Sequence, residues 1–125
     1  SANAVRLYPG AFSETLVQLM KERKLSNKKL ADASLVGERT IQRLRNEEEY
    51  PTTVQTVLGL CYGLKLSVPE AEMLVGKTDF NIKPTNPQNY AYRCALSACA
   101  ENNIYEINEM LVACGYIPFG SSNLE

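Results

Sequence analysis

The sequence predicts an all-α fold of about seven helices. Apolar residues recur at the i, i+3, i+4 spacing of a helix face along most of the 125-residue chain. Residues that favour helix starts stand ahead of most of these segments, and none shows the alternating pattern of a strand. With 45% apolar and 22% charged residues, the chain can bury a core and lacks the composition of a disordered protein.

The first three predicted helices span residues 13–24, 26–33 and 38–45. Ser13 and Ser26 are expected to cap the first two, because a serine oxygen can accept a hydrogen bond from an N–H group in the first turn. The second and third helices follow each other closely, which predicts a tight turn between them.

Two further helices precede a linker. Pro51 and the Thr52–Thr53 pair open the fourth helix. Its apolar stripe consists of Val54, Val57, Leu58 and Cys61. Ser67 is expected to cap the fifth, with Pro69 in its first turn, where the missing N–H costs nothing. Residues 77–89 (KTDFNIKPTNPQN) contain two prolines and three asparagines, a composition typical of a linker.

The last two predicted helices span about 86–100 and 105–114, with a turn at Asn102–Asn103 and a glycine stop at Gly115. We therefore expect a main domain over residues 1–82 and a helical extension over 83–125. The extension holds half of the ten Phe and Tyr residues: Tyr90, Tyr92, Tyr105, Tyr116 and Phe119. Aromatic side chains serve equally well as core, as a dimer interface or as an effector pocket.

Charge is distributed unevenly along the chain, whose net charge is −1. Residues 21–45 hold eight Lys and Arg against three Asp and Glu, a net +5. Residues 69–125 hold three against seven, a net −4. A basic segment in an acidic chain indicates a localised anionic partner, although a solvated helix face gives the same pattern.

No catalytic or metal chemistry is predicted. Histidine is absent, so the usual general base is missing, and no P-loop or nucleophile elbow occurs. Cys61, Cys94, Cys99 and Cys114 form no C-x-x-C pair, so neither a metal site nor a cofactor is expected. We expect reduced, buried cysteines; the alternative is a redox pair of Cys94 and Cys99.

Within residues 27–46, the apolar residues would point inward and leave a polar face. The expected inward set is Leu30, Ala31, Val36, Ile41 and Leu44. The side chains expected to read base edges are Glu38, Arg39, Gln42 and Arg43. Arginine pairs with guanine, glutamine with adenine, and glutamate accepts from cytosine, so this face suits readout in the major groove.

Three stretches of the sequence match a known family pattern in the same order: LA at 30–31, TIQR at 40–43, and PTTVQTVLGLCYGLKLS at 51–67. Through these stretches residues 12–67 resemble the phage-repressor and Cro-type helix-turn-helix proteins, the XRE family. The resemblance implies a lambda-repressor-like five-helix domain, here followed by a C-terminal helical hairpin. It also implies a recognition helix in the major groove of double-stranded DNA, and a homodimer on a palindromic site.

The resemblance extends to the residues that hold the DNA backbone. Asn27 matches the polar residue that opens the second helix and contacts phosphate. With it, we expect phosphate contacts from Lys28, Thr40 and Arg45. Because one helix reads only a few base pairs, specificity requires two half-sites about 34–36 Å apart.

Two departures from the family pattern bear on the site. Leu35 stands where the family has glycine, so either it accepts a left-handed conformation or the second helix runs on. Glu47, Glu48 and Glu49 follow the recognition helix and would repel phosphates unless their loop points away.

The sequence thus predicts a cytoplasmic transcriptional regulator, most simply a repressor, that is not an enzyme. The alternative is a protein-interaction module, such as an antitoxin-like or adaptor component, with a protein partner on the C-terminal hairpin. No apolar run approaches the roughly 20 residues of a membrane span, and no signal-peptide pattern opens the sequence.

Overall fold

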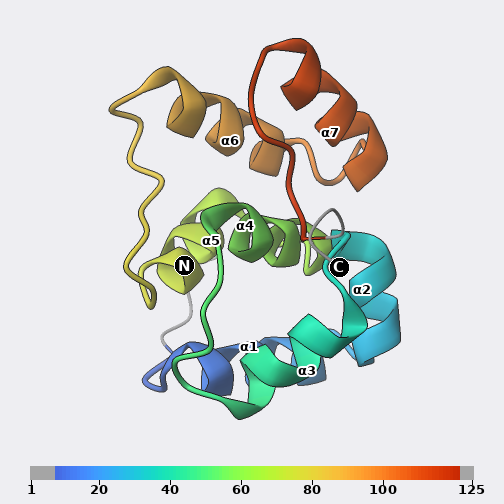
Figure 1. Ribbon diagram of the computed structural model, residues 1–125, viewed down its shortest axis with the longest axis vertical. Helices are drawn as coiled ribbons and strands as arrows, with labels where there is room; N and C mark the ends of the chain where they lie inside the picture. The colour runs from blue at the N-terminus through green and yellow to red at the C-terminus, as the bar shows by residue number, and fades with distance from the viewer. Residues whose placement is uncertain (1–7, 122–125) are drawn as a thin grey trace, which may run out of the picture.

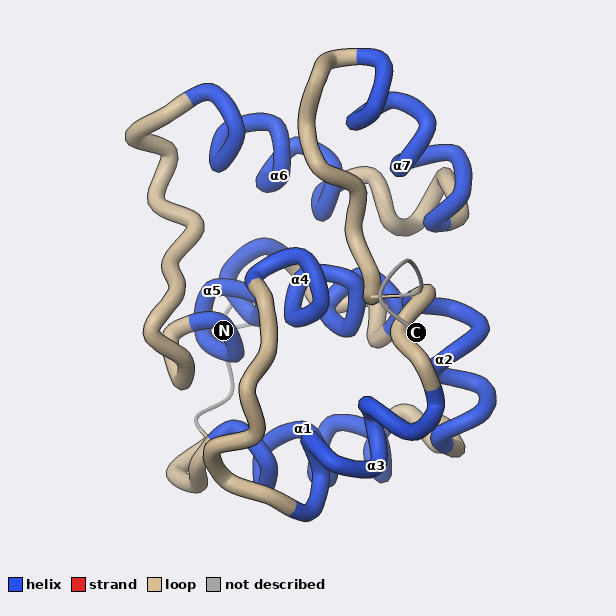
Figure 2. Tube along the Cα trace, viewed as in Figure 1, coloured by secondary structure: helices blue, strands red, loops and turns tan. Residues whose placement is uncertain are grey.

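The computed structural model describes residues 8–121, and every element in that range is a helix (Figure 2). The all-α prediction is therefore confirmed for the described residues. The helices are α1 (Phe12–Glu22), α2 (Asn27–Ser34), α3 (Glu38–Asn46), α4 (Val54–Gly63), α5 (Val68–Val75), α6 (Pro87–Ser97) and α7 (Ile104–Ala113). Residues 1–7 of the predicted main domain and residues 122–125 of the predicted extension lie outside the described residues.

The helices stack along the long axis of the molecule (Figure 1). α1 and α3 pack together at one end, and α6 and α7 lie at the other. α4 and α5 occupy the middle, and α2 runs along the side, where it packs on both α3 and α4. α4 is buried along most of its length because helices cover it from both ends of the stack.

Most predicted helix starts are confirmed by side-chain caps. Ser26, Thr53 and Asn86 accept hydrogen bonds from the N–H groups of Lys29, Thr56 and Asn89, respectively. Ser67 forms a reciprocal capping box with Glu70, which satisfies two N–H groups at the start of α5.

Three predicted boundaries were wrong: both ends of α1 and the end of α6. α1 ends at Glu22 rather than near Lys24, whose backbone is left-handed with φ 55°. α1 begins at Phe12 with Ala11 as its cap residue, because Phe12 is buried in the core and the first turn forms around it; Ser13 is buried within that turn. α6 ends at Ser97 rather than near Ala100, because turn hydrogen bonds replace the helical pattern from there on.

The close crossing of α2 and α4 depends on glycines of α4. Leu30, Val36, Ile41 and Leu44 are buried as predicted, but Ala31 is only half-buried. A Cβ atom on Gly63 would lie 3.0 Å from the Cβ of Ser34, and one on Gly59 would lie 2.7 Å from the Ser34 carbonyl oxygen. The small residues that allow the two backbones to approach are therefore Gly59 and Gly63, one turn apart on α4.

The aromatic residues of the extension divide between core and surface. Tyr92 and Phe119 are buried and belong to the same apolar cluster as the core of α1–α5. Tyr90 and Tyr105 are each 64% exposed, and Tyr116 is half-buried. The extension thus contributes to the core and also presents aromatic side chains to solvent.

The cysteines are all free, but their expected burial holds only for Cys61. Cys94, on α6, and Cys114, the residue that ends α7, are exposed, and Cys99 is partly buried. Burial raises the pKa of the Cys61 thiol far above its usual range, and desolvation also raises that of Cys99. Both thiols are therefore protonated at neutral pH, which does not favour a redox role for Cys99.

No helix among residues 8–121 is long and apolar enough to cross a membrane. Over the same residues, no group of three or more His, Cys, Asp and Glu side chains is placed to hold a metal ion.

Candidate nucleic-acid interface

The turn between α2 and α3 is made by a strained residue. Leu35 has φ 55° and ψ 29°, the left-handed conformation, so the first of the two alternatives for this turn holds. A residue with a Cβ atom loses about 1–2 kcal/mol in this region of backbone space. The Leu35 N–H still donates to the Ala31 carbonyl, which ends α2, and Val36 then buries its side chain.

The third helix separates its apolar and polar side chains on opposite faces. Ile41 and Leu44 are buried, which fixes α3 against α1 and the core. The four side chains predicted to read bases, Glu38, Arg39, Gln42 and Arg43, are all exposed. Long side chains on the free face of a helix whose opposite face is anchored can enter a groove of DNA without disturbing the core.

The four predicted phosphate-binding residues lie on α2 and α3. Arg45 donates from Nη1 to Asn27 Oδ1 at 2.6 Å, which joins the end of α3 to the start of α2. This bond occupies one of five guanidinium donors, so Arg45 retains the capacity to hold a phosphate oxygen. Lys28 is exposed on the first turn of α2, and Thr40 is half-buried on α3.

A groove of about 830 Å³ runs beside α3. Its lining is basic and hydroxyl-rich: Arg39, Thr40, Arg43, Tyr50, Pro51, Thr52, Thr53, Thr56 and Ser121. The guanidinium carbon of Arg43 lies 5.6 Å from the centre of the Tyr50 ring, a distance at which a cation and an aromatic face attract each other. Tyr50 therefore restrains one of the predicted base-reading side chains.

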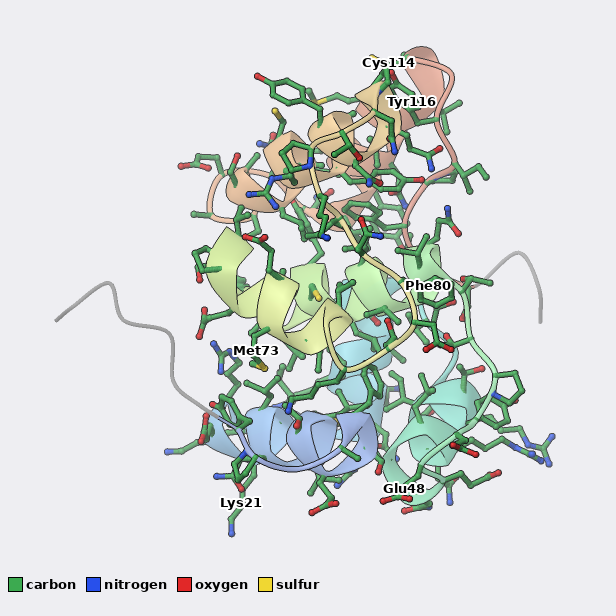
Figure 3. All side chains as sticks on the ribbon, turned by 90° about the vertical axis from the view of Figure 1, so that its left-hand side faces the viewer. Lys21, Glu48, Met73, Phe80, Cys114 and Tyr116 are labelled. Atoms are coloured by element: carbon green, nitrogen blue, oxygen red, sulfur yellow. The ribbon has the colours of Figure 1, made fainter. Side chains whose placement is uncertain are left out.

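The acidic loop does not line this groove. Glu47, Glu48 and Glu49 instead line an adjoining hollow of about 390 Å³, together with Lys77 and Phe80. The two hollows meet at residues 50–52, which line both. Figure 3 shows Glu48 at the lower end of the molecule and Phe80 nearer its middle. The carboxylates therefore lie beside the arginine-lined groove but not in its lining.

Only Arg39, Thr40 and Arg43 of the nine residues that line the groove were predicted as site residues from the sequence; Tyr50 and Ser121 are two of the six that were missed. Tyr50 lies four residues after the end of α3, and an aromatic residue seven positions after Arg43 could have suggested a stacking partner. Ser121 lies 84 residues from Gly37, to which it is hydrogen bonded, and no local pattern could have placed it there.

Comparison with known proteins agrees with this geometry. Residues 15–71, a little under half of the chain, match the family model of the Cro/C1-type HTH DNA-binding domain. The match covers most of α1, all of α2 to α4 and the start of α5, and it ends before the linker. Neither the comparison with curated proteins nor that with solved structures found a match.

Proposed function

We propose that this protein, whose residues 15–71 form a Cro/C1-type helix-turn-helix DNA-binding domain, is a sequence-specific transcriptional regulator that represses by occupying an operator. The observation that carries the proposal is the exposed face of α3, with four long polar side chains opposite a buried apolar face. In this function α3 enters the major groove, and α2 lies across the backbone.

The residues have distinct roles in the proposed complex. Arg39 and Arg43 pair with guanines, Gln42 with adenine, and Glu38 accepts from a cytosine amino group. Asn27, Lys28, Thr40 and Arg45 hold phosphates and so set the register of α3 on the duplex. The net charge of +5 over residues 21–45 supplies the electrostatic attraction.

Selection of bound duplexes from a random pool, followed by titrations at several salt concentrations, tests this function. A recurring consensus, with an affinity that falls steeply as salt rises, supports a sequence-specific regulator. Salt-dependent binding without a consensus would show that the protein binds DNA non-specifically, and would contradict the proposed sequence-specific regulator. No binding at any salt concentration would favour the alternative interaction module, which the family match does not itself suggest.

Arg39→Ala is expected to weaken binding to the selected duplex and to relax the consensus at one base pair. Arg39 is exposed near the start of α3, and a bidentate arginine–guanine pair contributes ~1–3 kcal/mol of discrimination. Lys83→Ala is the matched control, because it removes a positive charge from an exposed position in the linker. An unchanged consensus with Arg39→Ala would remove this residue from the proposed readout.

We also propose that the protein acts as a homodimer through its extension. Five large apolar side chains are exposed among the described residues, and all belong to the extension: Tyr90, Tyr105, Met110, Val112 and Ile117. Tyr105 and Val112 stand two turns apart on α7 and line a hollow with Pro118. Two copies joined through α7 would cover Tyr105 and Val112 and bring two recognition helices to one palindrome.

Tyr105→Glu is expected to convert the dimer into a monomer without unfolding it, because the side chain is 64% exposed and a charge there opposes burial in an interface. Light scattering at tens of micromolar measures the change. Tyr90→Glu, an equally exposed substitution on α6, is the control. A wild-type chain that is monomeric at this concentration would contradict the proposed dimer.

A further inference from the structure

The segment 117–121, here called the strap, connects the extension to the helix-turn-helix element (Figure 1). After α7 the chain turns back and reaches the level of α2 and α4 (Figure 2). Side chains of the extension hold its first part. The Tyr92 hydroxyl donates to the Ile117 carbonyl at 2.7 Å. The Asn108 amide binds both backbone groups of Phe119, at 2.8 and 3.0 Å.

The last two residues of the strap bind the turn that precedes the recognition helix. Ser121 donates its N–H to the Leu35 carbonyl at 2.8 Å, and its hydroxyl accepts from the Gly37 N–H at 3.2 Å. Gly120 donates its N–H to the Gln55 carbonyl of α4 at 2.9 Å. The strap therefore contacts both residues that define the start of α3: the left-handed Leu35 and the cap residue Gly37.

The strap has little freedom to shift independently of the turn. Phe119 is buried, with its ring centre 5.1 Å from that of Tyr92 and 6.2 Å from that of Tyr62. Gly120 has φ +109°, and a Cβ atom there would lie 2.6 Å from the Leu35 carbonyl oxygen. Backbone thus packs directly against backbone, so a displacement of the strap displaces the turn.

We infer that the strap positions the recognition helix, with Ser121 as a positioning residue for DNA readout; this inference rests on the proposed function. Base edges are read only when α3 lies at the correct depth and angle, whereas phosphate attraction tolerates a small shift. Leu35 holds a conformation that an isolated turn disfavours, and the strap supplies the hydrogen bonds that retain it. Residues far outside the matched domain therefore form part of its DNA-reading geometry.

Ser121→Ala in the full chain tests the inference, because it removes the bond to Gly37 and leaves the backbone bond to Leu35 in place. We expect affinity for the selected duplex to fall about five- to tenfold, and affinity for an unrelated duplex to change less than twofold. Asn108→Ala is expected to act in the same direction, since it frees Phe119. Asn89→Ala is the control, because that amide binds only the Lys83 carbonyl within the extension.

A purely structural role would give a different pattern. Affinities for both duplexes would then fall by one common factor, set by the folded fraction, which a denaturant titration of each variant measures. That outcome, or unchanged affinity for both duplexes with Ser121→Ala, overturns the inference. Ser121→Thr, which keeps the hydroxyl, should restore discrimination between the two duplexes.

Amide hydrogen exchange tests the strap without DNA. The Gly37 amide should exchange at least tenfold faster in Ser121→Ala than in the wild type, while amides in the middle of α4 keep their rates. If the wild type selects no consensus, the proposed function fails, yet this exchange measurement still decides whether the strap holds the turn. Equal Gly37 exchange in the two proteins would show that it does not.

Discussion

Gly59→Ala is expected to lower the free energy of unfolding by about 1–3 kcal/mol, the usual cost of overpacking a filled core. A Cβ atom at this position would lie 2.7 Å from the Ser34 carbonyl oxygen and 2.9 Å from the Gly120 nitrogen. Both neighbours are backbone atoms, so neither can move aside by a change of rotamer. Helix propensity alone predicts the opposite sign, because alanine is better than glycine within a helix by ~1 kcal/mol.

Denaturant titration followed by circular dichroism measures this effect. Gly76→Ala is the matched control. Gly76 is exposed at the end of α5 with an ordinary φ of −63°, and a Cβ atom there would lie 3.0 Å from the Glu72 carbonyl oxygen, so a smaller loss than in Gly59→Ala is expected. A Gly59→Ala protein as stable as the wild type would mean that α2, α4 and the strap can separate at low cost. In that case the strap would not hold the α2–α3 turn in a fixed position.

Tyr92→Ala is expected to destabilise the protein by about 3–5 kcal/mol, the range for removing a large aromatic side chain from a core. Tyr92 is fully buried, and its ring packs against that of Phe119 at a tilt of 59°. Its hydroxyl also links α4 to the strap, since it accepts from Gln55 Nε2 at 3.2 Å and donates to the Ile117 carbonyl. The substitution removes the ring and both hydrogen bonds together.

Tyr92→Phe separates these contributions, because it keeps the ring and loses the hydroxyl. We expect this variant to lose about 1–3 kcal/mol, the cost of leaving a buried polar partner unsatisfied. A loss in Tyr92→Phe as large as in Tyr92→Ala would assign the effect to the hydrogen bonds rather than to packing.

The Tyr92→Ala melt also tests the predicted division between residues 1–82 and 83–125. Core side chains on both sides of residue 82 form one cluster, so a single transition at a lower temperature is expected. Two separate transitions, with only the later one unchanged from the wild type, would show that the extension unfolds as an independent unit.

The helices and most of their starts could be predicted from the sequence because they depend on neighbours within four residues. Ser26, Thr53 and Ser67 each accept a bond from an N–H three residues ahead, and such spacings are visible in the chain itself. The two faces of α3 follow from the same periodicity. Burial of Ile41 and Leu44 and exposure of Arg39 and Gln42 are what that periodicity predicts.

The sequence by itself determined the helical class, the resemblance to a DNA-binding domain and the residues on the free face of α3. Only the tertiary structure decided which distant residues hold that helix in position. Ser121 meets Gly37 across 84 residues, and Gly59 is required because the backbones of α2 and the strap converge on it. Such contacts depend on how distant segments pack in three dimensions, and helical periodicity carries no information about that packing.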